Sequence, residues 1–162
     1  MAAASNVAVD NLGERLLLED IRVVRIGHPA RASEAIQPHC LNVLVDIEWQ
    51  VMEDINMEIE EILKKLHKLG TTKVTEAETT RLGLLDQLKH LKKKRTLAQK
   101  TLMAARIEHL EEASVVLSTL TGCKEKGPLK LVPMDYFNTC VIDECAQSLE
   151  MACWIAIHKV SC

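Results

Sequence analysis

Phe137-Asn-Thr-Cys-Val-Ile-Asp-Glu144 is an apolar run that ends in two adjacent acidic residues. The run predicts a strand over residues 137–142, with the carboxylates of Asp143 and Glu144 directly after it. Other β-branched runs also predict short strands: residues 22–26 and 114–118. Strands that alternate with helices are typical of an α/β fold with a parallel sheet, whose ligands gather at the carboxyl ends of the strands. The sequence therefore predicts such a fold, with a functional site where the two acids lie.

Helical patterns accompany these strands. Ser5 is suited to cap a helix that runs to Leu18, because a serine hydroxyl can accept from a backbone amide of the first turn. The apolar residues of this helix share one side: Val9, Leu12, Leu16 and Leu17. Another helix is expected from about Gln147 to Val160. We therefore interpret residues 1–45 and 113–162 as two pieces of one α/β domain.

Residues 46–112 have the clearest helical periodicity. Two apolar seams with steps of three and four predict two helices: Met52, Ile55, Ile59, Ile62, Leu66 and Leu69, then Leu84, Leu88, Leu91, Arg95, Ala98, Leu102 and Ala105. Gly70 is suited to end the first helix, and Thr75 with Glu78 forms a capping box for the second. Two such helices joined by a short turn predict an antiparallel hairpin that interrupts the α/β domain.

Composition sets limits on the class of protein. The 162 residues suffice for one domain with a modest core, and the net charge of -3 gives no global attraction to nucleic acid. The six cysteines form no CxxC pair, so a reducing, intracellular compartment fits best. Because no apolar run has the length of a membrane span and the start is too short for a signal peptide, we expect a soluble protein without a membrane partner.

The acidic pair is the sharpest candidate for chemistry. Asp143 could hold Mg²⁺ through water, because this cation takes oxygen ligands and keeps several waters. Glu144 could orient or deprotonate an attacking water. The alternative is a pair of solvated acids that cap the following helix, and spacing alone leaves both interpretations open.

A basic run on the second long helix is a further candidate. Lys92, Lys93 and Arg95, with Lys89 and Lys94, could contact phosphates without reading bases. The alternative is a solvated helix face, which is the commoner situation. The six histidines lack paired metal-ligand spacing, and none is assigned a site.

Three stretches resemble motifs of the superfamily 1 helicases, in the family's order. Val141-Ile-Asp-Glu-Cys-Ala-Gln147 is similar to motif II, the Walker B box. Ala4-Ser-Asn-Val-Ala-Val-Asp-Asn-Leu12 resembles motif Ia, and Val116-Leu-Ser-Thr-Leu-Thr-Gly-Cys123 resembles the strand and loop just upstream of motif II. The resemblance is strongest to the branch containing immunoglobulin mu-binding protein two, senataxin and the nonsense-mediated-decay helicase.

The resemblance implies roles for individual residues. Asp143 coordinates magnesium and Glu144 activates the hydrolytic water, with Gln147 near the nucleotide. The residues that match positions touching the nucleic-acid backbone are Ser5, Asn6, Thr119 and Thr121. The parent enzyme is then an ATP- and Mg²⁺-dependent helicase that unwinds RNA or DNA five-prime to three-prime on a single strand, in the nucleus or the cytoplasm.

Departures from the family pattern limit what this chain is expected to do alone. Ala4 stands where motif Ia has proline, and Leu120 where an asparagine is usual. The sequence contains no G-x-x-x-x-G-K-S/T motif. Residues 122–127 begin and end with glycine, but their lysines lie between the two glycines and not after the second one. Without that loop nothing cradles the β- and γ-phosphates. The second RecA-like domain of the parent is also missing from these residues.

We therefore expect a fragment that spans motif Ia to motif II: a partial RecA-like, P-loop NTPase sheet interrupted by a helical hairpin. On its own it should neither hydrolyse ATP nor bind ATP or Mg²⁺ tightly. Two alternatives stay open. One is a non-enzymatic nucleic-acid or protein-binding module derived from a helicase, and the other is a gene-model or splice fragment without a stable fold.

Overall fold

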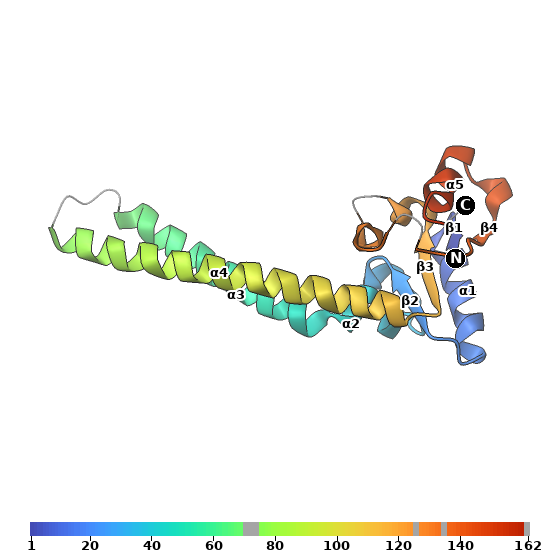
Figure 1. Ribbon diagram of the computed structural model, residues 1–162, viewed down its shortest axis with the longest axis horizontal. Coiled ribbons are helices and arrows are strands. Elements are labelled where there is room, and N and C mark those ends of the chain that lie inside the picture. The colour runs from blue at the N-terminus through green and yellow to red at the C-terminus, as the bar shows by residue number, and fades with distance from the viewer. Residues whose placement is uncertain (70–74, 125–126, 134–135, 161–162) are drawn as a thin grey trace. The chain divides into compact units, whose positions relative to one another are not determined.

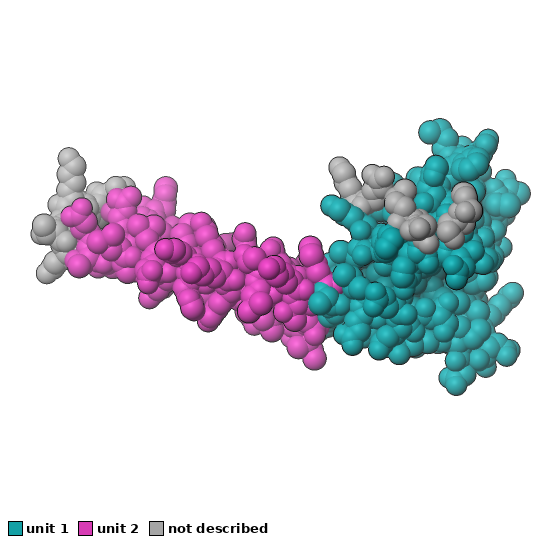
Figure 2. Space-filling view, viewed as in Figure 1, with its two compact units in different colours: residues 1–46, 104–162 teal, residues 47–103 magenta. Residues whose placement is uncertain are grey.

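The computed structural model describes residues 1–69, 75–124, 127–133 and 136–160, and the side chains of residues 75–77 are not described. The predicted helix end at Gly70 and the side chain of Thr75 in the predicted capping box lie outside the described residues. The chain divides into two compact units, Met1–Asp46 with Ala104–Cys162, and Ile47–Met103 (Figure 2). Each unit is considered by itself below.

The first unit is built around a parallel sheet. Its described strands are β1 (Ala2–Ala3), β2 (Val23–Ile26), β3 (Val115–Thr119) and β4 (Ile142–Asp143). They lie in the order β2-β3-β1-β4, and every pair of neighbours is parallel (Figure 1). The predicted α/β fold with a parallel sheet is confirmed. The second and third strands begin one residue later than their sequence patterns suggest.

One face of the sheet is covered by α1 (Asn6–Leu18), which contacts β1, β2 and β3. Ser5 caps this helix as predicted, since its hydroxyl oxygen accepts from the backbone N–H of Ala8 at 3.1 Å. Gly13 lets the helix approach closely, because a Cβ there would lie 2.8 Å from Cδ1 of Leu117 on β3. The core on this side contains Ala3, Ala8, Val9, Val23 and Leu117.

The other face of the sheet carries a second core. Val24 on β2 and Val116 on β3 point to it, whereas their neighbours Val23 and Leu117 point to α1. This alternation is the period of two that a strand imposes. The residues that cover this face come from α2 (Leu41–Leu44), the last turns of α4 (Thr75–Glu112) and α5 (Glu150–Ile157): Leu41, Leu110 and Ala156. Short 3-10 turns connect these parts: Pro29–Arg31, Gln37–His39, Leu120–Cys123, Pro128–Leu131 and Cys145–Gln147.

Two predicted elements near the C-terminus are shorter than expected. The strand predicted over residues 137–142 is wrong for most of its length, because only β4 joins the sheet and Phe137 instead pairs with Val160. A strand can extend only as far as its neighbour offers backbone groups, and β1 has two residues. The predicted helix from Gln147 is also wrong at its start, because Ser148 is extended (φ -104°, ψ 150°) and α5 begins at Glu150.

The second unit contains α3 (Asp46–Leu69) from Ile47 onward and the part of α4 up to Met103. Its core joins residues of both predicted seams: Ile59, Ile62, Leu88 and Leu91, with Ile55, Leu66 and Leu84 partly buried. Arg95, which the second seam includes, is exposed, because its charged group stays solvated. Among the described helices of both units, none combines the length and apolarity that a membrane crossing requires.

Candidate functional site

The carboxyl ends of three strands meet at one level of the sheet. Ala3 at the end of β1 is paired with Thr119 on one side and with Asp143 on the other. Since neighbouring strands lie about 4.8 Å apart, the backbones at Thr119 and Asp143 are about 10 Å apart. Ser5 follows Ala3 by two residues, at the point where the chain turns into α1. Three segments far apart in the sequence therefore meet at one edge.

The acidic pair lies at one end of this row of strand ends, because β4 is the outermost strand in the described order. Asp143 and Glu144 are both exposed. The Asp143 carboxylate accepts from the backbone N–H of Glu144 at 2.9 Å. Glu144 has a left-handed backbone (φ 54°), which turns the chain sharply after the strand. Such a conformation is unfavourable for a residue with a side chain and is often found at functional sites.

Two expectations about the acidic pair need correction. A mostly apolar strand before the pair favours burial on both faces, but Ile142 is only half-buried, because a strand at the edge of the described sheet has a neighbour on one side. The alternative interpretation, solvated acids that cap the following helix, agrees with the exposure of both residues. The capping part is wrong for α5, whose N-cap is Leu149, and Glu144 is the N-cap only of the turn Cys145–Gln147, without a side-chain hydrogen bond. The turn Cys145–Gln147 lies between the acids and this helix, and it ends in Gln147, which is exposed.

The donor set at the acidic pair matches a hard cation held mainly through water. Asp143 and Glu144 supply carboxylate oxygens, which magnesium prefers to nitrogen or sulfur ligands. Among the described residues no group of three or more His, Cys, Asp or Glu side chains could hold a metal ion. Two carboxylates would leave most positions around a magnesium ion to water, as in sites completed by substrate phosphates.

Two threonines lie at the middle of the edge. Thr119 ends β3, and its hydroxyl oxygen accepts from the backbone N–H of Gly122 at 3.2 Å. The hydroxyls of Thr119 and Thr121 are 3.4 Å apart. Gly122 allows this turn to be tight, because a Cβ there would lie 2.5 Å from Oγ of Ser118. The turn places two hydroxyls side by side, and Thr121 is exposed.

The start of α1 completes the edge. The Ser5 hydroxyl oxygen caps the helix, so its hydrogen is still able to donate elsewhere. Asn6, the first helical residue, accepts a hydrogen bond through Oδ1 from Nη2 of Arg25 at 2.8 Å. The first turn contains no acidic residue. The positive end of the helix dipole therefore faces this edge without a local negative charge from that turn.

Sequence reasoning missed the residue that organises this region, Arg25. Its guanidinium is buried in the first unit, where Nε donates to Oδ1 of Asp10 at 2.7 Å and Nη1 donates to the carbonyl of Ile26 at 3.1 Å. The other oxygen of Asp10 accepts from the backbone N–H of Ser33 at 2.8 Å. An arginine inside an apolar strand pattern was the available signal, because a buried charge needs a partner.

The basic run belongs to the second unit. Lys92, Lys93 and Arg95 are all exposed on α4. Exposure is compatible both with phosphate contacts and with a solvated helix face. The strand-end site consists of residues of the first unit alone: Ser5, Asn6, Thr119, Thr121, Asp143, Glu144 and Gln147.

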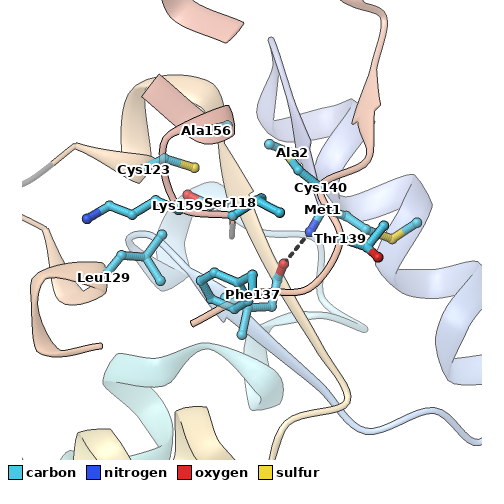
Figure 3. Close-up of a pocket in the computed structure, with 12 residues that line it drawn as sticks. Met1, Ala2, Ser118, Cys123, Leu129, Phe137, Thr139, Cys140, Ala156 and Lys159 are labelled. Carbon is cyan, nitrogen blue, oxygen red and sulfur yellow. Dashed lines mark hydrogen bonds between the residues drawn. The ribbon is translucent and has the colours of Figure 1, made fainter. Parts of the chain in front are cut away.

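A small pocket of about 40 Å³ lies in the first unit and is lined in part by Ala2 and Ser118, next to the strand ends (Figure 3). Cys123, Cys140, Phe137 and Lys159 help to line it. Burial raises the pKa of the Cys123 and Cys140 thiols above the ordinary value for cysteine. Both thiols therefore stay protonated and are weak nucleophiles. This pocket is therefore a poor candidate for thiol chemistry.

Comparison with known proteins identifies the chain. The family described as "AAA domain" matches residues 1–161, so the chain belongs to that family. It is 40% identical over 159 residues to DNA-binding protein SMUBP-2 of Rattus norvegicus, which covers 97% of this chain and 15% of that protein. It is 31% identical to DNA polymerase alpha-associated DNA helicase A of Saccharomyces cerevisiae, with 94% of this chain and 22% of that protein covered.

A third relative, the Regulator of nonsense transcripts 1 homolog of Drosophila melanogaster, is 31% identical over 97% of this chain and 11% of its own length. These relatives are superfamily 1 helicases. More narrowly, then, the chain is a member of the superfamily 1 helicases, in the branch of the mu-binding protein and the nonsense-decay helicase. The predicted resemblance is confirmed, and the chain spans less than a quarter of the length of each of these relatives.

Proposed function

We propose that this chain is the part of an ATP-dependent helicase in which a nucleotide-responsive acidic motif and a nucleic-acid contact share one sheet edge. The observation that carries the proposal is the register of Ala3, which pairs with Thr119 and with Asp143. Neighbouring parallel strands are coupled through backbone hydrogen bonds. A shift of β4 on nucleotide turnover would therefore also displace the turn after Thr119 and the start of α1.

Roles at the nucleotide end follow from chemistry and exposure. Asp143 is proposed to hold Mg²⁺ through water, and Glu144 to orient and deprotonate a water molecule. Gln147 lies one short turn further along and can donate or accept at the same edge. ATP with Mg²⁺, when bound in the whole enzyme, supplies the phosphoryl group that is cleaved. The exposed carboxylates are accessible to such a substrate from solvent.

Roles at the nucleic-acid end follow from the donors there. The hydroxyls of Ser5, Thr119 and Thr121 and the amide of Asn6 can donate to phosphate oxygens. The dipole at the start of α1 favours the same negative groups. Contacts of this kind position a backbone without reading bases. The proposed ligand is therefore single-stranded RNA or DNA in any sequence, and the proposed activity of the whole protein is unwinding in the five-prime to three-prime direction.

The domain organisation is proposed on the same basis. Residues 1–45 and 113–162 are two pieces of a RecA-like domain, and residues 46–112 are an antiparallel helical hairpin inserted between them. The basic residues Lys92, Lys93 and Arg95 give the insertion a possible phosphate-contacting face of its own. This proposal gains support from the shared core of α3 and α4 in the second unit.

Binding of a fluorescent single-stranded oligothymidylate, followed by anisotropy, tests the proposal. Thr121→Ala removes an exposed hydroxyl at the edge, and we expect a loss of affinity of roughly threefold to tenfold. Ser114→Ala is the matched control, because Ser114 is exposed directly before β3, at the end of that strand opposite Thr119. Equal affinity of both variants and the wild type would contradict the proposed site.

A second candidate function is a non-enzymatic binding module. The observation that favours it is an apolar groove of about 310 Å³ in the second unit, lined by Ile47, Val51, Ile55 and Leu97 together with Lys94 and others.

Nucleic-acid binding through the basic run would have a strong salt dependence. Neutralising Lys92, Lys93 and Arg95 should then lower the slope of log affinity against log salt by about 0.7 for each lost contact. An unchanged slope would favour the strand-end site alone.

A further inference from the structure

Arg25 is a buried cation whose guanidinium donates three hydrogen bonds to three different residues. Nε donates to Asp10, Nη1 to the carbonyl of Ile26, and Nη2 to Oδ1 of Asn6, at 2.7, 3.1 and 2.8 Å. The side chain is 1% exposed, so water does not compete for these bonds. The guanidinium is planar and its donors have fixed directions, which a lysine cannot reproduce.

The contact with Asn6 determines which end of its amide faces outward. A guanidinium has donors and no acceptor, so only the oxygen of the Asn6 amide can face it. Nδ2 branches from the same carbon in another direction, so its two hydrogens are left for other acceptors. Asn6 is the first residue of α1 and is half-buried, so part of this residue is accessible to solvent. The arrangement makes Asn6 a donor toward its surroundings.

We propose that Arg25 is a positioning residue that orients Asn6 to donate its Nδ2 hydrogens to a nucleic-acid phosphate. The inference deepens the proposed function, because it rests on a nucleic-acid contact at Asn6. Arg25 does not touch the ligand itself, since its guanidinium is buried. Asp10 neutralises its charge at 2.7 Å, so Arg25 acts through geometry rather than through attraction of phosphate.

The surroundings of Arg25 hold the guanidinium in this orientation. The second oxygen of Asp10 is held by the backbone N–H of Ser33, so the carboxylate cannot rotate freely. Gly27 provides the space, because a Cβ there would lie 2.1 Å from Nη1 of Arg25. The guanidinium is therefore constrained by an acid, a carbonyl and a glycine before it reaches Asn6.

A double-mutant cycle on binding of a fluorescent single-stranded oligothymidylate tests this inference. Asn6→Ala should weaken binding by roughly fivefold to tenfold, because a hydrogen bond to a charged phosphate is lost. Asn11→Ala is the matched control, since Asn11 is exposed on the same helix and should change affinity by less than about twofold. Arg25→Lys keeps the buried charge but loses the planar guanidinium with its fixed donor directions. This variant should weaken binding by roughly threefold or more.

The fourth corner of the cycle separates positioning from stability. If Arg25 acts through Asn6, adding Arg25→Lys to Asn6→Ala should change affinity by less than about twofold. Equal losses from Arg25→Lys in both backgrounds would show a merely structural role and overturn the inference. If Asn6→Ala binds as tightly as the wild type, the proposed contact itself fails. If Asn6→Ala is weak and Arg25→Lys is normal, only the positioning role fails.

A measurement on the wild type covers the case in which Arg25→Lys does not fold. In two-dimensional nitrogen-proton spectra, the Nδ2 resonances of Asn6 should shift on addition of oligothymidylate, and those of Asn11 should not. A shift of the backbone N–H of Asn6 without its Nδ2 resonances would overturn the inference, because the amide would then not donate to the ligand.

Discussion

Arg25 and Asp10 form an ion pair at 2.7 Å inside the first unit, with side chains 1% and 8% exposed. The pair joins β2 to α1, and Asp10 also accepts from the backbone of Ser33. A buried ion pair contributes little net stability compared with apolar residues, but removal of one partner leaves the other charge without compensation. The pair therefore makes the region sensitive to single substitutions.

Asp10→Ala should lower the free energy of unfolding by about 3–5 kcal/mol, because the Arg25 charge then stays buried without a partner. Urea unfolding followed by circular dichroism measures this loss. The double variant Arg25→Met with Asp10→Ala should lose less than Asp10→Ala alone. A double variant that is less stable than the single one would contradict the argument about uncompensated charge.

Gly27→Ala and Gly83→Ala should have opposite effects on stability. Gly27 has φ 150°, and a Cβ would lie 2.1 Å from Nη1 of Arg25, so alanine should cost at least about 1 kcal/mol. Gly83 lies within α4, and a Cβ there meets nothing within 4 Å. Alanine should stabilise that helix by about 0.5–1 kcal/mol. Thermal unfolding of the two variants checks both signs, and destabilisation by Gly83→Ala would show a constraint at that position that the helix does not explain.

The thiols should differ in reactivity. Cys145 is exposed, whereas Cys123 is buried and burial raises the pKa of its thiol above the ordinary value of 9.0. We expect iodoacetamide to modify Cys145 before Cys123, since the thiolate is the reactive form and it must also be accessible. Mass spectrometry of peptides after short exposure measures the order. Faster labelling of Cys123 than of Cys145 would contradict the burial of Cys123.

The same shift predicts a pH dependence of stability. Because the pKa of Cys123 is raised in the folded state, the unfolded chain loses this proton at lower pH than the folded chain does. Its contribution to stability is complete below the ordinary pKa and is lost as the pH rises through the folded value. The free energy of unfolding should therefore fall above about pH 9, and less steeply in Cys123→Ala. Identical slopes for the two proteins would rule out this thiol as a cause.

ATP turnover by the pure 162-residue chain should not exceed the background, because its sequence contains no G-x-x-x-x-G-K-S/T loop for the phosphates. Release of phosphate in the presence of Mg²⁺ and single-stranded DNA measures this.

The control variant Asp143→Ala should change the free energy of unfolding by less than about 1 kcal/mol, since Asp143 is exposed. Turnover that is present in the wild type and disappears in Asp143→Ala would overturn the prediction.

Local patterns in the sequence were enough for the helices α1, α3 and α4 and for the class of fold. The Ser5 cap, the β-branched runs that became β2 and β3, and the apolar seams of α3 and α4 all depend on residues close together in the chain. The motifs around Asp143 and Ser5 were enough for the family. Such signals survive in the sequence because cap geometry and apolar periodicity are properties of single elements.

Only the tertiary structure decided how these elements meet. The register that aligns Ala3 with Thr119 and Asp143, the shortening of β4, and the burial of Arg25 against Asp10 all involve segments distant in the chain. A strand pattern says which face is apolar, but the length of a strand depends on the backbone groups that its neighbour offers. A charged residue in an apolar run likewise says nothing about its partner, because that partner arrives only when the helix packs on the sheet.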